Sequence, residues 1–260
     1  MVKIAIIGAG FFGLTLGLIL SKKHSVQVFE KQKSIMNGAS SANQYRFHLG
    51  YHYPRSQKTV AEINKSKDVF TSFFGLSVFG KTLNYYLVAN DSKVKFKTYA
   101  SFLKRNKLFY KILKNKFNDA FIEKSILTNE KILNFFNFKK KIISKINKSN
   151  LKLHFNKEFK KKSIKNFDKI IVTTYANNNA VLESLGIKKL NEFKFELVEK
   201  ILIKLPKKLR KKSFVVVDGN FVCVDPYLGT NYHLLSDVKN SKLETKIGKF
   251  PNFKHENKRY

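Results

Sequence analysis

The chain has 260 residues, which is enough for one large domain or for two lobes that each bury a core. Its single cysteine, Cys223, excludes an internal disulfide framework, and we find no convincing export signal, so we expect a cytoplasmic protein. The net charge of +33 would suit a partner such as nucleic acid or an anionic membrane surface.

The lysines are nevertheless spread along the whole chain, together with many Asn, Ile and Phe residues. This pattern is typical of a general amino-acid bias. The densest clusters lie at residues 139–141, 160–162 and 207–212, and we interpret them as solvated faces or turns. We therefore expect no specific nucleic-acid partner, and binding of RNA stays as an alternative.

Residues 2–30 predict a strand, a glycine-rich turn, a helix and a second strand that ends in an acid. Gly8 would let the chain turn sharply, Gly10 would leave room for a pyrophosphate, and Gly13 would let the helix pack close to the strand. The phosphates would lie on the free N–H groups of the helix N-terminus. Glu30 would accept hydrogen bonds from the adenosine ribose. This context indicates a dinucleotide-binding site.

The uncharged run from Ile4 to Leu20 has a second interpretation, because a membrane span or a signal-peptide core is also apolar. The run carries its glycines at the dinucleotide spacing and continues directly into a plausible strand. We therefore expect no membrane span.

The next part of the chain alternates between small-residue loops and apolar patterns. Residues 38–43, Gly-Ala-Ser-Ser-Ala-Asn, form a loop that suits close approach of a ligand to the backbone. Periodicity predicts helices over 56–74 and 94–109 and a strand over 83–89. Residues 109–146 hold short apolar clusters that we leave as a mixed region.

The pattern from residue 150 onward is dominated by strands. Alternation over 151–155 predicts a half-buried strand, and the β-branched run over 168–174 predicts a strand of a buried parallel sheet. A helix is expected over 180–185, closed by Gly186. Further strands are expected over 193–205, 214–217, 221–224 and 231–235, with a turn at Asp218–Gly219. We interpret Asp225 as a turn former too.

These elements predict an α/β protein. We expect a Rossmann-like nucleotide-binding domain with a doubly wound, mostly parallel sheet, and an inserted α+β substrate lobe that contains an antiparallel sheet. The predicted bounds are 1–54 and 148–187 for the first domain, 55–147 and 188–238 for the lobe, and 239–260 for a basic tail.

The segment 46–55 directly follows the small-residue loop and is rich in groups that can bind or react. Arg46 and Arg55 could clamp a carboxylate or phosphate. His48 and His52 could move a proton near neutral pH. A structural turn is the alternative role for this segment. No metal site is expected, because two histidines alone are too few ligands.

Together, the turn Gly8–Gly13, the pair Glu30–Lys31 and the loop 38–43 resemble the FAD-dependent oxidoreductases of the D-amino-acid oxidase (DAO) type. The resemblance covers residues 1–55 well and 150–186 moderately, and elsewhere only the order of elements. It implies FAD as cofactor, an FAD-binding domain, and an antiparallel sheet that roofs the flavin. It also implies hydride transfer to flavin N5 from an amine- or hydroxyl-bearing carbon of a small substrate. Arginine beside the flavin would favour a substrate that carries an anionic group.

The resemblance also implies which residues contact the cofactor, namely Gly8, Gly10, Phe12, Gly13, Glu30, Lys31, Ser40, Ser41, Asn43 and Thr174. The family closes its flavin site with a further glycine-rich segment near the C-terminus, and this chain shows none. A truncated, non-catalytic flavin-fold protein is therefore an alternative. An NAD(P)-dependent dehydrogenase and a flavin-fold protein that acts on RNA are two others. Substrate, electron acceptor and oligomeric state are left open.

Overall fold

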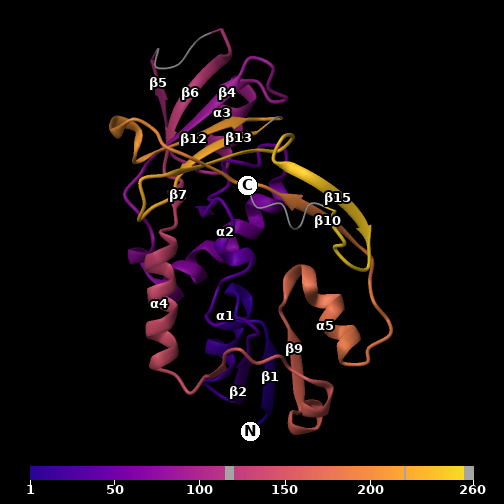
Figure 1. The fold of residues 1–260 in the computed structure, drawn as a ribbon. Helices are drawn as coiled ribbons and strands as arrows, with labels where there is room; N and C mark the ends of the chain where they lie inside the picture. Colours follow the sequence, from indigo (N-terminus) through magenta and orange to yellow (C-terminus); the bar gives the residue numbers. More distant parts are fainter. Residues whose placement is uncertain (115–119, 220, 255–260) are drawn as a thin grey trace. The chain divides into compact units, whose positions relative to one another are not determined.

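The computed structural model describes residues 1–114, 120–219 and 221–254, and it divides into two compact units (Figure 1). Unit 1 comprises Met1–Asn43, Lys139–Val198 and the chain from Lys242 onward, and unit 2 comprises Gln44–Phe138 and Glu199–Ser241. The predicted segments follow the same order along the chain, but the observed boundaries differ from the predicted ones. The functional roles of the two units stay predictions.

Unit 1 is built on a parallel sheet of four strands in the order β8-β2-β1-β9. Its strands are β1 (Lys3–Ile7), β2 (Ser25–Phe29), β8 (Lys152–His154) and β9 (Lys169–Val172). Helix α1 (Phe11–Leu20) packs against β1 and β2, and α5 (Asn178–Ser184) packs against β9. Parallel neighbours need crossover connections, and here α1 supplies the one between β1 and β2. The predicted Rossmann-like α/β class is confirmed.

A two-stranded ribbon in unit 1 corrects two predictions. We expected one strand over 193–205, but β10 (Phe193–Val198) pairs antiparallel with β15 (Lys242–Gly248), whereas β11 (Ile201–Ile203) belongs to the sheet of unit 2. The predicted basic tail is wrong in part for the same reason, because β10 supplies backbone hydrogen-bond partners that hold this Lys-rich segment as a strand. Residues 255–260 of the predicted tail lie outside the described residues.

Unit 2 contains a seven-stranded sheet in the order β11-β14-β13-β12-β4-β6-β5. Besides β11, its strands are β4 (Leu83–Ala89), β5 (Tyr110–Leu113), β6 (Ile122–Thr128), β12 (Lys212–Val217), β13 (Val222–Pro226) and β14 (His233–Asp237). Among the described residues only β12 and β4 pair in parallel, and the other neighbours are antiparallel. The lobe therefore contains the predicted antiparallel sheet, with one parallel pair added.

Three helices and a short ribbon complete unit 2. Helix α2 (Gln57–Phe74) matches the prediction and begins at Ser56, whose side chain accepts a hydrogen bond from the Thr59 N–H. Helix α3 (Phe96–Arg105) is shorter than the predicted 94–109. Lys107 adopts φ +54° and the Leu108 N–H bonds back to the Leu103 carbonyl, a C-terminal cap that ends the helix. The expected mixed region contains β5, β6, the short strand β7 (Lys131–Ile132) and α4 (Phe135–Asn147), which crosses the unit boundary.

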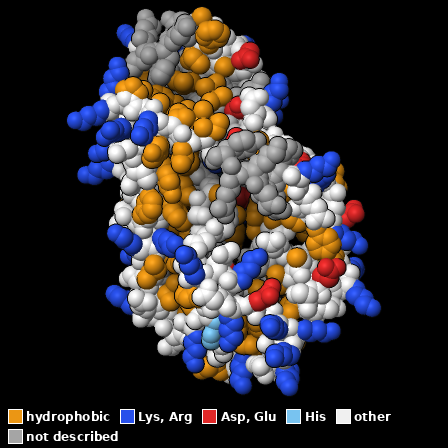
Figure 2. Space-filling view, viewed as in Figure 1, with side chains coloured by type: hydrophobic (Ala, Val, Ile, Leu, Met, Phe, Trp, Pro, Cys, Tyr) orange, Lys and Arg blue, Asp and Glu red, His pale blue; other side chains and the backbone are white. Residues whose placement is uncertain are grey.

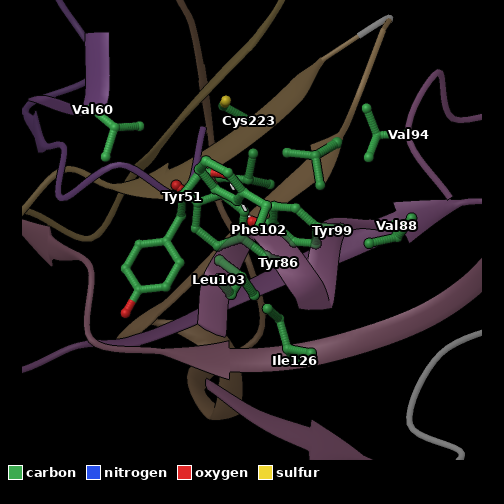
Figure 3. Packing of buried hydrophobic residues seen from close by; sticks show 12 residues of the cluster. Tyr51, Val60, Tyr86, Val88, Val94, Tyr99, Phe102, Leu103, Ile126 and Cys223 are labelled. Atoms are coloured by element: carbon green, nitrogen blue, oxygen red, sulfur yellow. Dashed lines mark hydrogen bonds between the residues drawn. The ribbon is translucent and has the colours of Figure 1, made fainter. Parts of the chain in front are cut away.

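The core of unit 2 mixes aliphatic side chains with three buried tyrosines (Figure 3). Each tyrosine hydroxyl has a partner: Tyr99 donates to the Tyr51 carbonyl at 2.8 Å, and Tyr51 donates to the Phe109 carbonyl at 2.7 Å. Tyr86 points its hydroxyl at Glu130, at 3.1 Å. Burying a phenol is favourable only when its hydroxyl is satisfied, so these bonds fix the segment around residue 51 onto the sheet.

The surface repeats the scatter of charge that the sequence predicts. On the face that Figure 2 shows, Lys and Arg side chains lie dispersed among other residues and do not gather in one patch. Within the described part of the chain, no helix combines the length and apolar character that a membrane span requires.

Two paired residues of the sheet in unit 2 test how far its core extends toward the edge strand β5. Ile126 on β6 is fully buried, whereas its register partner on β5, Ile112, is about half exposed. We expect Ile126→Ala to lower the free energy of unfolding by about 2–5 kcal/mol, because it removes buried methylene groups and leaves a cavity. Ile112→Ala is the matched control and should cost about 1 kcal/mol or less. Urea denaturation of both variants checks this, and equal losses would contradict the difference in burial.

Candidate functional site

The glycine-rich turn between β1 and α1 needs glycine for two different reasons. Gly8 has φ +103°, and a Cβ there would lie 2.9 Å from the Thr173 carbonyl oxygen. A Cβ on Gly13 would lie 2.0 Å from the Gly8 carbonyl oxygen, which no small shift relieves. At Gly10 the nearest atom is the Ser40 hydroxyl, 3.3 Å away. Packing alone therefore explains Gly8 and Gly13, whereas a Cβ on Gly10 would require only a small shift of the Ser40 side chain.

The N-terminus of α1 faces the small-residue loop. Gly10 is the N-cap and offers no side-chain hydrogen bond, while the Phe11 N–H donates to the Ser40 hydroxyl at 3.0 Å. Ser41 and Asn43 bond to backbone carbonyls of their own loop, at 2.8 and 3.2 Å. The structure thus brings Ser40 to the helix end, where partial positive charge favours an anion. The other predicted contact of the turn, Phe12, is largely exposed.

Glu30 lies at the carboxyl end of β2, beside the turn. One carboxylate oxygen accepts the Ala9 N–H and the other accepts the Gln32 N–H, both at 2.8 Å. Each oxygen keeps acceptor capacity for a further donor, since a carboxylate offers about four lone-pair sites. Glu30 is therefore held where a ribose hydroxyl could reach it. Lys31, its neighbour, is exposed.

After β9 two threonines lie against the turn: the predicted Thr174, whose methyl group would be 3.2 Å from a Cβ on Gly8, and Thr173. Both the N–H and the hydroxyl of Thr174 bond to the Asn178 side-chain oxygen, at 2.8 and 3.0 Å. Thr173 instead donates its hydroxyl to the carbonyls of Ile7 and Gly8, at 2.9 and 3.1 Å. Our sequence reasoning missed Thr173, although its place directly after the buried strand was a usable signal.

In unit 2 a short antiparallel ribbon places a histidine opposite a carboxylate. Strand β3 (Arg46–Phe47) pairs with β7 so that Arg46 faces Ile132 and Phe47 faces Lys131. The next facing pair is His48 and Glu130. Their side chains meet, with 2.9 Å between His48 Nδ1 and Glu130 Oε1, and the Leu49 N–H donates to the other oxygen at 3.0 Å. Glu130 was not predicted, because only this pairing reveals it.

Arg46 lies buried in a cluster of polar groups from four strands. Its guanidinium donates to Asp225, to the Ser213 hydroxyl at 2.6 Å and to the Tyr86 hydroxyl at 3.1 Å. Glu130 is 3.8 Å away. Both terminal nitrogens therefore have protein partners, which favours the structural role for Arg46 over a clamp on substrate.

Asp225 corrects our interpretation of it as a turn former. It is fully buried on β13, where it accepts hydrogen bonds from Arg46, from Ser213 at 2.6 Å and from Gln44 at 3.1 Å. The Asp-Pro pair suggested a turn, but Pro226 is the last residue of the strand and interrupts nothing.

Two buried carboxyl groups, Glu130 and Asp225, lie beside the guanidinium of Arg46. Burial alone would raise the pKa of the Glu130 carboxyl, but the hydrogen bond to His48, the charge of Arg46 and the Leu49 N–H outweigh it and lower that pKa. Burial likewise opposes the charge on Arg46, yet the surrounding Tyr86, Asp225 and Glu130 raise its pKa. Burial is also the largest influence on Asp225 and raises its pKa.

His52 lies four residues further in a different environment. Its ring stacks on Phe221 with 4.6 Å between centroids and lies 5.0 Å from the His48 ring. Burial, then the charges of His48 and Arg46, lower the pKa of His52 to about 3. Its buried Nδ1 has no hydrogen-bond partner among the described residues. His52 is therefore a neutral ring at physiological pH.

Arg55 is the accessible cation of the predicted segment. Its side chain is 56% exposed and pairs with Asp218, which is almost fully buried. Nη2 donates to Asp218 Oδ1 at 3.2 Å, and Nε donates to the other oxygen. Within the described residues, no group of three or more His, Cys, Asp or Glu side chains could hold a metal ion.

Comparison with known proteins agrees with this geometry. Residues 3–114 match the family model described as FAD dependent oxidoreductase (DAO), so the predicted resemblance is confirmed. FAD and an FAD-dependent oxidoreductase, the predicted cofactor and enzyme class, agree with this family.

Two curated relatives are similar over short stretches. The FAD-dependent monooxygenase FPY4 of Fusarium mangiferae is 33% identical over 72 residues, which are 27% of this chain and 19% of the relative. The FAD-dependent monooxygenase kojA of Aspergillus flavus is 41% identical over 58 residues, 22% of this chain and 14% of the relative. The chain therefore matches less than a fifth of the length of these relatives.

Solved structures share the fold over nearly the whole chain. Glycine oxidase from Geobacillus kaustophilus has a TM-score of 0.67 at 14% identity and covers 96% of this chain and 73% of its own. L-proline dehydrogenase from P. horikoshii has a TM-score of 0.68 at 14% identity. The match covers 94% of this chain and 72% of the dehydrogenase chain. L-alpha-glycerophosphate oxidase from Mycoplasma pneumoniae, with FAD bound, has a TM-score of 0.65 at 14% identity. The match covers 95% of this chain and 73% of the oxidase chain.

The buried charge cluster predicts a large cost for removing its cation. Arg46→Met should lower the free energy of unfolding by about 3–5 kcal/mol, because it leaves buried carboxylates without compensation. The control is Lys194→Met, which breaks an exposed ion pair with Glu196 and should cost about 1 kcal/mol or less. Urea denaturation measures both. A loss near the control value for Arg46→Met would show that the cluster does not need its cation.

His52 predicts a pH dependence of stability. An unfolded histidine has a pKa of about 6.5, whereas folded His52 has a pKa of about 3, so the unfolded chain binds the extra proton between these values. His52 therefore makes the free energy of unfolding rise with pH in this window, by up to about 1.4 kcal/mol per pH unit. His52→Phe should remove this slope, and Tyr53→Phe, in the same aromatic cluster, should keep it. Equal slopes in the wild type and His52→Phe would contradict the prediction.

Proposed function

We propose that unit 1 binds FAD and that the protein oxidises a small substrate at a carbon that carries an amine or a hydroxyl group. The observation that carries this proposal is the turn itself. The N-terminus of α1, where Gly10 carries no side chain, and the carboxylate of Glu30 lie together at the carboxyl ends of β1 and β2. Ligands of open parallel sheets bind at this edge.

The residues present fit a dinucleotide. Gly10 carries no side chain where a pyrophosphate would approach, and the first N–H groups of α1 would bind its oxygens. The Ser40 hydroxyl already accepts a hydrogen bond from the Phe11 N–H at this helix end, so a phosphate oxygen could take its place as acceptor. Glu30 would accept hydrogen bonds from the ribose hydroxyls. Ser41, Asn43 and Lys31 stay proposed contacts.

The names of similar proteins support both substrate classes. Two structural neighbours are named for glycine and L-proline, which carry an amine, and a third is named for L-alpha-glycerophosphate, which carries hydroxyl groups. The similar curated proteins are named as FAD-dependent monooxygenases. These names support flavin-dependent oxidation in general and leave the substrate of this chain as a proposal.

Bound FAD would supply a ring that accepts a hydride from the substrate carbon. Side chains of the protein would bind the substrate and handle its proton. Arg55, exposed and next to a buried carboxylate, would bind an anionic group of the substrate, and His48 would hold or accept a proton. Chain continuity favours these roles, because Asn43 of the small-residue loop precedes the segment 46–55 by two residues.

The experiment that tests the proposal is the visible absorption spectrum of the purified protein, with the chromophore identified after denaturation. Flavin bands and released FAD would support it. A colourless protein that does not take up added FAD would overturn it and favour a non-catalytic flavin fold or a nicotinamide cofactor. Tight binding of RNA that weakens steeply with salt would favour the RNA alternative.

A substitution at Gly10 gives a quantitative test of the proposed FAD site. Gly10→Ala should raise the Kd for FAD about tenfold or more, equivalent to about 1.4 kcal/mol, because the methyl group occupies the space above the turn. The added Cβ would lie 3.3 Å from the Ser40 hydroxyl, a tight contact that a small rotation of this side chain relieves, so the melting temperature without FAD should change little. Gly248→Ala, at a position with open space, is the matched control. FAD titration followed by fluorescence measures the Kd, and unchanged affinity in Gly10→Ala would place the cofactor elsewhere.

A further inference from the structure

The ribbon of β10 and β15 in unit 1 has two unpaired edges. Its two strands bond to each other and, among the described residues, to no third strand (Figure 1). Two-stranded ribbons are marginally stable by themselves, and β15 is seven residues long. An edge of this length presents a row of backbone N–H and C=O groups that can pair with another strand.

The side chains of β15 alternate between its two faces. Leu243, Thr245 and Ile247 lie on one face, where all three are exposed, and Ile247 is 76% exposed. Glu244 and Lys246 lie on the other face, with 3.3 Å between the carboxylate oxygen and the amine nitrogen. Lysines on an edge strand commonly keep other strands away. Here an acid lies two residues from the lysine, so the edge offers both signs of charge.

The sequence of β15 is complementary to itself. When two copies of the strand pair antiparallel about Thr245, Leu243 of one copy lies opposite Ile247 of the second copy. In the same register Glu244 lies opposite Lys246, and both pairings occur twice because the arrangement has two-fold symmetry. Cross-strand pairs of opposite charge, and pairs of threonines, stabilise a sheet. The contact between leucine and isoleucine adds to this, because it removes apolar surface from water.

The distribution of charge also favours this edge as the contact. Two copies of a chain with a net charge of +33 repel one another. In the ribbon, by contrast, Glu196 binds Lys194 and Lys242, and Glu244 binds Lys246. The two strands therefore carry three lysines and two glutamates, which is close to neutrality. At physiological ionic strength, exposed charges more than about 8 Å apart are largely screened, so the local pairs decide the contact.

We propose that the partner of this edge is a second copy of the chain. The two β15 strands pair antiparallel about a two-fold axis at Thr245, and the two ribbons become one four-stranded sheet in the order β10-β15-β15-β10. Leu243 of each copy contacts Ile247 of the other, and two pairs of Glu244 with Lys246 form across the interface. The contact lies within unit 1 of each copy and uses no residue proposed to bind FAD.

Sedimentation velocity of the full chain over a range of protein concentrations, at physiological salt, tests the proposal. We expect an equilibrium between monomer and dimer. Thr245→Lys should raise the Kd of the dimer about fivefold or more, because two lysines then face each other on the axis. Thr245 is exposed, so the melting temperature of the monomer should change little. The matched control is Val69→Lys, which adds the same charge at a 68% exposed position on α2 and should leave the Kd unchanged.

A charge exchange tests the register. Glu244→Lys alone would place lysines opposite each other, and Lys246→Glu alone would place glutamates opposite each other, so each variant should dimerise more weakly than the wild type. A mixture of the two variants should form a heterodimer, because every lysine at these positions then faces a glutamate of the other copy. Circular dichroism of each variant checks that its fold is retained.

Three outcomes would overturn the proposal. The first is a chain that stays monomeric at every concentration. The second is a dimer whose Kd changes neither in Thr245→Lys nor on charge exchange, since another surface would then form the contact. The third is growth into longer polymers, which pairing of β10 with β15 of the next copy would produce because that contact does not close.

Discussion

The rest of unit 2 depends on the buried guanidinium of Arg46. Removing a carboxylate from water costs several kcal/mol, and both Asp225 and Glu130 are fully buried. Arg46 compensates them while its hydrogen bonds join β3 to β12, β13 and β4. Such clusters are weak evidence for stability, since apolar replacements of similar volume often serve equally well. What this cluster provides here is position, because its bonds determine where the chain after β3 must run.

That position is what makes two histidines of one segment different. His48 follows β3 directly and lands opposite Glu130, so it gains a carboxylate partner. His52 lies one turn further, stacked on Phe221 within the aromatic core, where a charge would lose its hydration and find no partner. One ring therefore has a carboxylate partner and the other packs against an aromatic ring, so the two histidines are not equivalent.

The elements that sequence reasoning predicted well are those whose cause is local. Strand, glycine turn and helix over residues 3–20 follow one another without interruption, and each signal lies within a few residues of its partner. The single strand expected over 193–205 failed because alternation does not show which sheet each half joins. Asp225 was misinterpreted for a related reason: the Asp-Pro pair is a local turn signal, but its carboxylate is held by Arg46, 179 residues away in the sequence.

The same contrast between local signals and distant contacts separates the residues proposed to bind the cofactor from those proposed to contact the substrate. The groups proposed to hold FAD lie almost entirely within the first 43 residues, so a family match over residues 3–114 contains them. The match also contains His48, but it ends before Glu130 and Asp225, the two groups that decide what the segment 46–55 can do. General flavin chemistry can thus be inferred from the matched region. The contacts of the segment 46–55 depend on pairings across 82 residues or more, which only the fold brings together.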